Sequence, residues 1–310
     1  MSKNKTFEYR IKAGENGLEI IDFLTNKFTY LSSNEWIFEI ENKNLVVKDK
    51  EINPHYKLCE SDVIQFIRNS YSEPDVDKNY EIVYESENLL IINKPGNLPV
   101  HPAGRYKENT LLSLLTDHKK YENLFPAHRL DRETSGIQIF AKNKITASVI
   151  QKQFEERTIY KEYIVYIHGI FPEMINAVGY LKKDEKSRIR KKKSFSTNFT
   201  EKSTFSDTIF KNILQVNNIS KVLAIPKTGK NHQIRATLFS LGYPVYGDKI
   251  YGKDENCFLK FINGEIDLEF KRQALHSYSI IIPESNMYPK IEIVVPEPLE
   301  LKEIFRQVEK

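Results

Sequence analysis

The chain has 310 residues, of which 40% are hydrophobic and 28% charged, so it can bury a core and is not a disordered protein. Its two cysteines exclude a disulfide framework or a zinc ligand set, and its seven histidines show no metal-binding spacing, so we expect no metal. The net charge is only +4, no apolar run is long enough to span a bilayer, and the start lacks a secretory signal, so we expect a cytoplasmic protein.

The first 70 residues predict a small α/β unit. Apolar residues recur at helical spacing over 16–31, and residues 45–67 alternate as strands do, with a hairpin tip at Asp49-Lys50. The polar stretch 71–79 contains a proline and is predicted to be a linker. Residues 1–70 carry 10 Lys and Arg against 11 Asp and Glu, a balance of −1.

A second core begins near residue 80. Strand patterns and helix patterns are mixed in this part, without the regular alternation of a Rossmann fold. The predicted strands are 82–84, 89–92, 137–141, 158–169 and 220–226, and the predicted helices are 145–156 and 232–241. This order predicts an α+β fold, with one domain over residues 80–310.

The charged loop HRLDRETSG, residues 128–136, precedes a strand that alternates as a half-buried strand does. If Leu130 points into the core, Asp131 lies at the rim of a pocket with Arg129 and Arg132 nearby. Cations favour an ionised carboxylate and burial disfavours it. Asp131 is therefore a candidate nucleophile or base, and the alternative is a structural salt-bridge cluster.

Two other polar residues belong to predicted regular elements. Tyr163 lies in a strand, where a tyrosine is usually a packing residue. Arg235 falls in the first turn of a helix, where a cation needs a carboxylate or phosphate nearby, unless it forms an ordinary surface ion pair. The TGK at 228–230 lacks the full phosphate-loop pattern, so we reject a nucleotide triphosphate site.

One segment concentrates the positive charge. Residues 182–193, KKDEKSRIRKKK, hold eight Lys and Arg against two Asp and Glu, a balance of +6. Such a segment can contact a polyanion, or it can be a solvated surface loop whose charges repel. The sequence supports both interpretations equally.

Several segments, in the correct order, resemble the motifs of the RluA-type RNA pseudouridine synthases. HRLDRETSG resembles HRLDRxTSG, NKPGNLPVHP resembles NKPxGxxVHP, and KEYIVYIHG resembles KxYxAxVxG. TGKNHQIRATLFSLGYPVYGDKIYG resembles TGRxHQIRxHLxxxGxPIxGDxxYG, and ALHSYSI resembles LHAxxLxF. The agreement runs from about residue 80 to the end, and residues 1–70 resemble a degraded S4-type RNA-binding domain.

The resemblance implies that the chain isomerises uridines to pseudouridine in structured ribosomal or transfer RNA, without a cofactor. It implies a mixed, mostly antiparallel sheet with flanking helices. Asp131 would be the catalytic aspartate, Tyr163 would lie against the flipped base, Arg235 would pair with Asp131, and Arg129 would hold or replace the extruded nucleotide. The other residues expected to contact RNA are His128, Arg132, Lys94, His101, Lys230, His232, Lys191, Lys192 and Lys193. We expect a monomer with no membrane partner.

Four residues depart from the family pattern, namely Lys230, Asn231, Thr237 and Ser277. Lysine cannot grip a phosphate with two parallel hydrogen bonds as arginine does. These departures keep open a second hypothesis, an RNA-binding or ribosome-assembly protein with impaired catalysis. A third hypothesis, a carboxylate-based hydrolase, needs a second carboxylate beside Asp131, and Glu133 is the near candidate.

Overall fold

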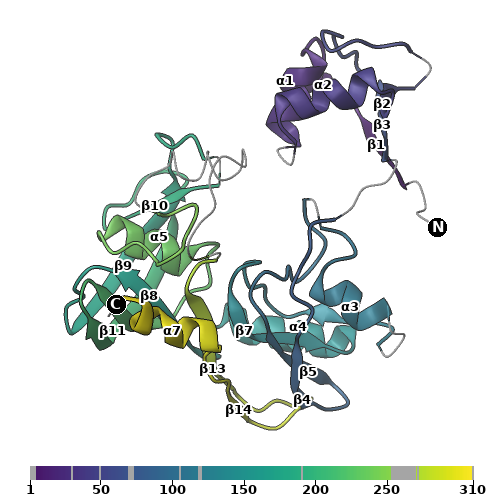
Figure 1. Cartoon of the computed structure of the whole chain (residues 1–310). Helices are drawn as coiled ribbons and strands as arrows, with labels where there is room; N and C mark the ends of the chain where they lie inside the picture. Colours follow the sequence, from purple (N-terminus) through teal and green to yellow (C-terminus); the bar gives the residue numbers. More distant parts are fainter. Residues whose placement is uncertain are drawn as a thin grey trace. The chain divides into compact units, whose positions relative to one another are not determined.

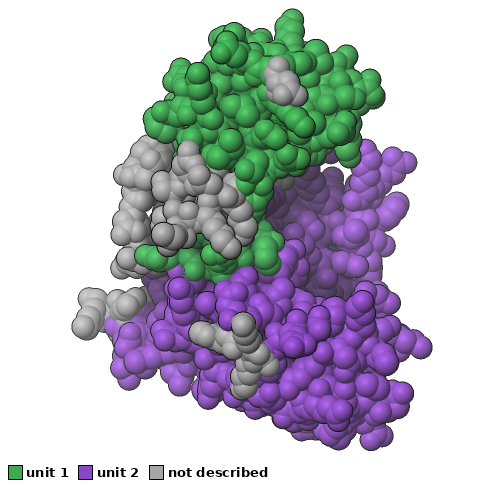
Figure 2. Space-filling view, turned by 90° about the vertical axis from the view of Figure 1, so that its right-hand side faces the viewer, with its two compact units in different colours: residues 1–75, 102–109 green, residues 76–101, 110–310 purple. Residues whose placement is uncertain are grey.

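The computed structural model describes residues 5–28, 31–48, 50–68, 73–104, 106–117, 121–189, 191–252, 270 and 272–308. The chain forms two compact units, each described by itself below (Figures 1 and 2). Unit 1 comprises residues 1–75 and 102–109, and unit 2 comprises residues 76–101 and 110–310. In the described part of the chain, no helix has the length and apolar character needed to cross a membrane.

Unit 1 is a three-stranded antiparallel sheet with two α-helices packed on it. Its elements are β1 (Lys5–Arg10), the 3-10 turn η1 (Ala13–Glu15), α1 (Ile20–Lys27), α2 (Ser33–Glu41), β2 (Leu45–Val47) and β3 (Val63–Arg68). The strand order is β1-β3-β2. Trp36 is fully buried at the centre of the core, where its ring packs on Phe66. The expected small α/β unit is therefore present, and its S4-like character stays a prediction.

Unit 1 departs from the expectations in two details. Strands β2 and β3 pair across a long connection, in which Lys50 forms an isolated antiparallel bridge with Val47; the expected hairpin tip Asp49-Lys50 includes Asp49, which lies outside the described residues. The segment 102–109 belongs to this unit although it is distant in sequence. The Glu73 carboxylate accepts the backbone N–H groups of residues 107–109 at 2.8–3.0 Å and so holds that segment.

Unit 2 is built around one large sheet. Its strands are β4 (Glu81–Glu85), β5 (Leu89–Lys94), β6 (Phe125–Pro126), β7 (Ser135–Ala141), β8 (Tyr160–His168), β9 (Met174–Lys183), β10 (Lys193–Ser196), β11 (Thr204–Val216), β12 (Ile219–Pro226), β13 (Leu275–Ile282) and β14 (Ile291–Val294). Its helices are α3 (Leu111–Asp117), α4 (Lys144–Glu155), α5 (Gln233–Ser240) and α7 (Leu299–Val308).

The sheet order is β10-β9-β11-β12-β8-β13-β7-β5-β4, with β14 paired to β13 and β6 paired to β7. Only the β13–β7 pair is parallel among the described strand pairs, which confirms the predicted mixed, mostly antiparallel sheet. Strand β7 was expected to be half-buried, and this was wrong. All seven of its residues are buried, because strands flank it on both edges and cores lie against both faces.

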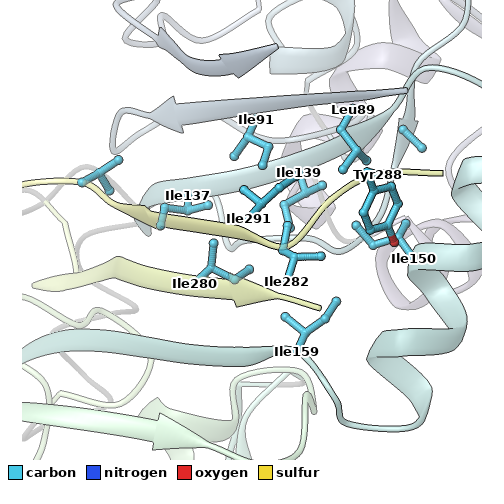
Figure 3. Close-up of a cluster of buried hydrophobic side chains, with 12 residues drawn as sticks. Leu89, Ile91, Ile137, Ile139, Ile150, Ile159, Ile280, Ile282, Tyr288 and Ile291 are labelled. Carbon is cyan, nitrogen blue, oxygen red and sulfur yellow. The ribbon is translucent and has the colours of Figure 1, made fainter. Parts of the chain in front are cut away.

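Helix α4 covers one face of β7 and closes the largest core cluster (Figure 3). Ile150 of α4 packs there with Ile139 of β7 and Ile280 of β13, and each of these side chains is at most 1% exposed. The predicted apolar face of α4 is correct except at Ile145, whose side chain is 68% exposed. This cluster fixes the strand that carries the charged loop.

Helix α5 lies against β9 and β10, as Figure 1 shows. Ile234 and Leu238 pack on the sheet together with Val165 of β8 and Phe210 of β11. The helix ends as predicted before Gly242, whose φ of +89° is the left-handed conformation that favours glycine. Packing of α5 on the sheet positions its buried Arg235 toward the loop that precedes β7.

Candidate active site

Asp131 and Arg235 meet in the structure although they lie 104 residues apart in sequence. Arg235 Nη1 donates to Asp131 Oδ2 at 2.8 Å. Leu130 is buried as expected, while the Asp131 side chain keeps 25% of its surface exposed. The carboxylate therefore stands at the rim of the core, anchored on one side and accessible on the other.

A second carboxylate, that of Asp248, binds the side of the Arg235 guanidinium that faces away from Asp131. Asp248 Oδ2 accepts Arg235 Nε at 2.6 Å, and Asp248 Oδ1 accepts Arg235 Nη2 at 2.8 Å. The same Oδ1 also accepts the backbone N–H groups of Ile250 and Tyr251. This fork-to-fork arrangement fixes the guanidinium plane, because both parallel hydrogen bonds must be kept. Arg235 thus presents one remaining edge to Asp131.

The surroundings keep Asp131 ionised. Burial raises the pKa of its carboxyl, but the positive charge and hydrogen bond of Arg235 outweigh burial, so the pKa lies below the ordinary aspartate value. Gln273 Nε2 adds a weak hydrogen bond at 3.4 Å and is itself held by Thr134 at 2.6 Å. A partly exposed, ionised carboxylate can attack an electrophilic carbon or accept a proton.

Tyr163 lies on the face of β8 that α5 covers and joins two core clusters. Burial raises the pKa of its phenol to about 12, and the nearby charge of Asp131 acts in the same direction. Tyr163 is therefore a neutral phenol at neutral pH. Ser277, one of the residues that depart from the family pattern, partly counteracts this rise in the pKa of Tyr163 through its side chain.

Glu133 does not form a carboxylate pair with Asp131. Its oxygens accept from Lys249 at 2.5 Å, from Arg132 at 2.8 Å and from the backbone N–H of Gln273 at 3.1 Å. These bonds tie the charged loop to the segments before β13. The hydrolase hypothesis loses its second carboxylate, because Glu133 is fully engaged in holding the loop.

Lys94 requires a correction. We expected an RNA contact, but its side chain is completely buried, and its Nζ donates to the carbonyl oxygens of Pro95, Leu98 and Arg132 at 2.8–3.1 Å. Three carbonyl acceptors match the three N–H donors of an ammonium group. Lys94 therefore links the NKPGNL loop to the loop that carries Asp131.

His128 also contacts the protein backbone. Its Nε2 accepts the backbone N–H of Ile139 at 3.2 Å, and its ring packs on Phe154. Burial, with a contribution from the charge of Lys161, lowers the pKa of His128 to about 3. A neutral ring that accepts a β7 amide holds the loop in place, so the half-buried His128 has a structural role, and its contact with RNA stays a prediction.

Three further predicted residues lie near the charged loop. The side chain of Arg129 is exposed, so it is available to a ligand. His101 is half-buried, and burial together with the charge of Arg129 lowers its pKa. Arg132 is half-buried and donates to Glu133, which places it in the loop framework.

The loop that precedes α5 carries Lys230 and His232. Lys230 is exposed, as is Asn231. His232 Nε2 lies 4.0 Å from Asp131 Oδ1, and its Nδ1 is 3.0 Å from the Tyr251 hydroxyl. Burial and the charge of Arg235 lower the pKa of His232 to about 4, so this ring is neutral at pH 7.

The basic segment is not a simple surface loop. Lys182 and Lys183 end β9, and Lys193 begins β10, which pairs with β9 in an antiparallel hairpin. Lys191 is exposed, whereas Lys192 is buried over the Phe239 ring of α5. The segment thus combines a hairpin end with an exposed tip, and its Arg190 lies outside the described residues.

Sequence reasoning missed Asp248 and Gln273. Asp248 belongs to the GDKIYG stretch that was quoted for the resemblance, and its neighbour Gly247 has a φ of +69°. A Cβ at Gly247 would lie 2.2 Å from the Arg272 carbonyl oxygen, so the backbone must be glycine there. The glycine next to Asp248 was therefore a signal in the sequence for a constrained backbone, whereas the sequence around Gln273 offered no such signal.

The chain is also similar in sequence to known proteins. The family model described as RNA pseudouridylate synthase matches residues 88–240. Ribosomal large subunit pseudouridine synthase C of Buchnera aphidicola subsp. Schizaphis graminum is 30% identical over 270 residues, covering 83% of each chain. RNA pseudouridine synthase 7 of Oryza sativa subsp. japonica is 30% identical over 76% of this chain, which spans 60% of that protein's length.

A solved structure agrees as well. Human RNA pseudouridylate synthase domain containing 1 superposes with a TM-score of 0.57 at 27% identity, covering 73% of this chain and 87% of the human one. Together with the ordered motifs and the Asp131 site, these similarities define the class of protein. The chain belongs to the RluA-type RNA pseudouridine synthase family.

Proposed function

We propose that this chain converts specific uridines of ribosomal or transfer RNA into pseudouridine, with Asp131 as the catalytic carboxylate. The observation that supports this most is the Asp131–Arg235–Asp248 arrangement, in which a buried arginine holds an accessible carboxylate ionised. Burying an unpaired carboxylate would cost several kcal/mol, so the arginine explains how Asp131 is kept charged beside a core.

The reaction rearranges one nucleotide without an oxidant or reductant. The bond from N1 of the base to C1′ of the ribose breaks, the base turns, and C5 bonds to C1′. The C5 proton leaves and N1 gains a proton. Asp131 opens the glycosidic bond, while Tyr163 packs against the base. Because its phenol is neutral, Tyr163 does not act as a preformed phenolate; we assign it to holding the base while C5 loses its proton to solvent, from which N1 takes one up.

The target base must leave its stack before it can reach Asp131. Extruding a base costs a few kcal/mol. Arg129 is the exposed cation of the charged loop, and it offsets this cost by holding the extruded nucleotide or filling its place.

We place the reaction in the cytoplasm, because the exposed thiol of Cys59 is free, as is usual in a reducing compartment.

Purified protein incubated with RNA from cells lacking this gene tests the proposal. The wild type should form pseudouridine, detected by carbodiimide labelling and primer extension. Asp131→Asn should lower the rate by at least about 10³-fold, because the amide carries no charge and is a poor nucleophile. Asp117→Asn, at the exposed end of α3, is the matched control and should retain full activity. An active Asp131→Asn protein would overturn the assignment.

A further inference from the structure

Lys161 belongs to the KEY motif but has no part in the proposed chemistry so far. It lies two residues before Tyr163 on β8, so both side chains extend from the same face of the sheet, roughly 7 Å apart along the strand. Its Nζ lies 5.3 Å from the centroid of the Phe154 ring. Lys161 therefore extends along the same face as the tyrosine that is proposed to meet the base.

No carboxylate compensates this ammonium group within the described residues. Burial lowers the pKa of Lys161, and it forms no ion pair in the described part of the chain. The carboxylate of Asp207, on β11, lies 3.6 Å from Lys227 instead. Lys161 is half-buried, so its ammonium group loses part of its hydration without gaining a counter-ion, and a bound anion would offset that cost.

The space beside Lys161 is bordered by further cations. A Cβ placed on Gly229 would lie 4.0 Å from Lys161 Nζ, and Lys230 follows directly in the chain. Lys193, at the start of β10, is half-buried, and burial together with the charge of Lys230 lowers its pKa. Lys161 and Lys230 thus flank the glycine turn that precedes α5, with Lys193 near Lys230, and the described residues contain no ion-pair partner for any of the three.

We propose that Lys161, Lys230 and Lys193 form a binding site for a phosphodiester group of the RNA substrate, beside the site of the target uridine. Lys161 is the inner member, and it acts on a phosphate near the base that Tyr163 meets. Lys230 and Lys193 continue the site toward the exposed end of the basic hairpin. The absent side chain of Gly229 leaves room for the phosphate. This inference rests on the proposed function for the identity of the substrate.

The test is the salt dependence of RNA binding and turnover. Wild type, Lys161→Gln, Lys161→Arg and Lys227→Gln are compared on RNA from cells lacking the gene. Lys161→Gln should raise KM about five- to tenfold at 50 mM KCl, since one phosphate contact contributes about 0.7 to the slope of log affinity against log salt. Its kcat at saturating RNA should stay within about twofold of wild type, and Lys161→Arg should restore KM. Lys227→Gln, whose charge is already paired with Asp207, is the matched control.

Lys230→Gln gives an independent reading, because its exposed side chain can be changed without disturbing folding. It should reduce the salt slope by a similar amount. A wild-type slope in both variants, or a loss of kcat at unchanged KM in Lys161→Gln, would overturn the site. If the wild type forms no pseudouridine, the proposed function fails, and filter binding of the same RNA across salt concentrations still decides the phosphate site by these slopes.

Discussion

Two groups of cations in unit 2 have opposite surroundings. Arg235 is buried between Asp131 and Asp248, and its donors to both carboxylates are satisfied. Lys161 and Lys230 have no carboxylate partner among the described residues. Paired charges fix geometry before the substrate arrives, whereas unpaired charges supply affinity when it binds. The comparison separates the residues expected to affect kcat from those expected to affect KM.

Replacing Arg235 should break the paired group most severely. In Arg235→Met, two neighbouring carboxylates lose their shared cation, and breaking a buried pair costs about 3–5 kcal/mol of stability. Activity should fall by more than about 10³-fold, because Asp131 loses both its orientation and its stabilised charge. Thermal unfolding and pseudouridine formation measure the two effects. A stable and active Arg235→Met protein would show that the pairing is incidental.

Acidification should destabilise the paired group through His232. Its pKa is about 4 in the folded protein, against an ordinary value of 6.5, so the unfolded chain binds a proton that the folded chain does not. This contribution to stability is complete above pH 6.5 and is lost as the pH falls toward 4, by about 3 kcal/mol. Calorimetry across this range should show a shallower pH dependence of stability in His232→Asn, because asparagine does not titrate. Asparagine also tolerates the left-handed backbone conformation at this position.

The same neutral ring predicts the pH profile of catalysis. The pKa of Asp131 lies below its ordinary value and that of His232 is about 4, so kcat/KM should have no acidic limb between pH 5 and 7. An acidic limb centred near pH 6.5 would contradict the assignment of a neutral His232.

Asp248→Asn should have a smaller effect, which separates positioning from direct chemistry. Asparagine keeps the shape but loses one acceptor of the Arg235 fork, so Arg235 turns more freely against Asp131. We expect kcat to fall about 10²-fold, as for a displacement of about 1 Å at a reacting group. The KM for RNA should stay unchanged, because Asp248 is not among the residues proposed to contact phosphate. Equal losses in kcat and KM would indicate general disruption of the site.

The sequence predicted the elements that carry the site better than the contacts within it. The strand after the charged loop and α5 were found because their apolar periodicity is local, and β8 was found from its β-rich composition. Helix α2 was missed, although Ser32 and Glu35 form a capping box just before Trp36, which was a readable signal. Local patterns therefore defined most of the architecture that positions Asp131.

Contacts over long sequence distances were beyond local patterns. Lys94 and His128 lie in charged, turn-rich stretches that indicate exposure, yet each is used to hold the backbone near Asp131. The pairing of Arg235 with Asp131 was expected from the resemblance, whereas its clamp by Asp248 was not. Burial of a polar side chain depends on acceptors supplied from elsewhere in the fold, and sequence spacing does not report them.

The most direct test of the central claim is a pseudouridine map of total RNA from the source cells. The gene is deleted, and the cells are complemented with the wild-type chain or with Asp131→Asn. The account predicts that one or a few sites disappear on deletion, return with the wild type and stay absent with Asp131→Asn. Sites that return with Asp131→Asn, or no lost site in cells shown to express the protein, would contradict it and favour the RNA-binding alternative.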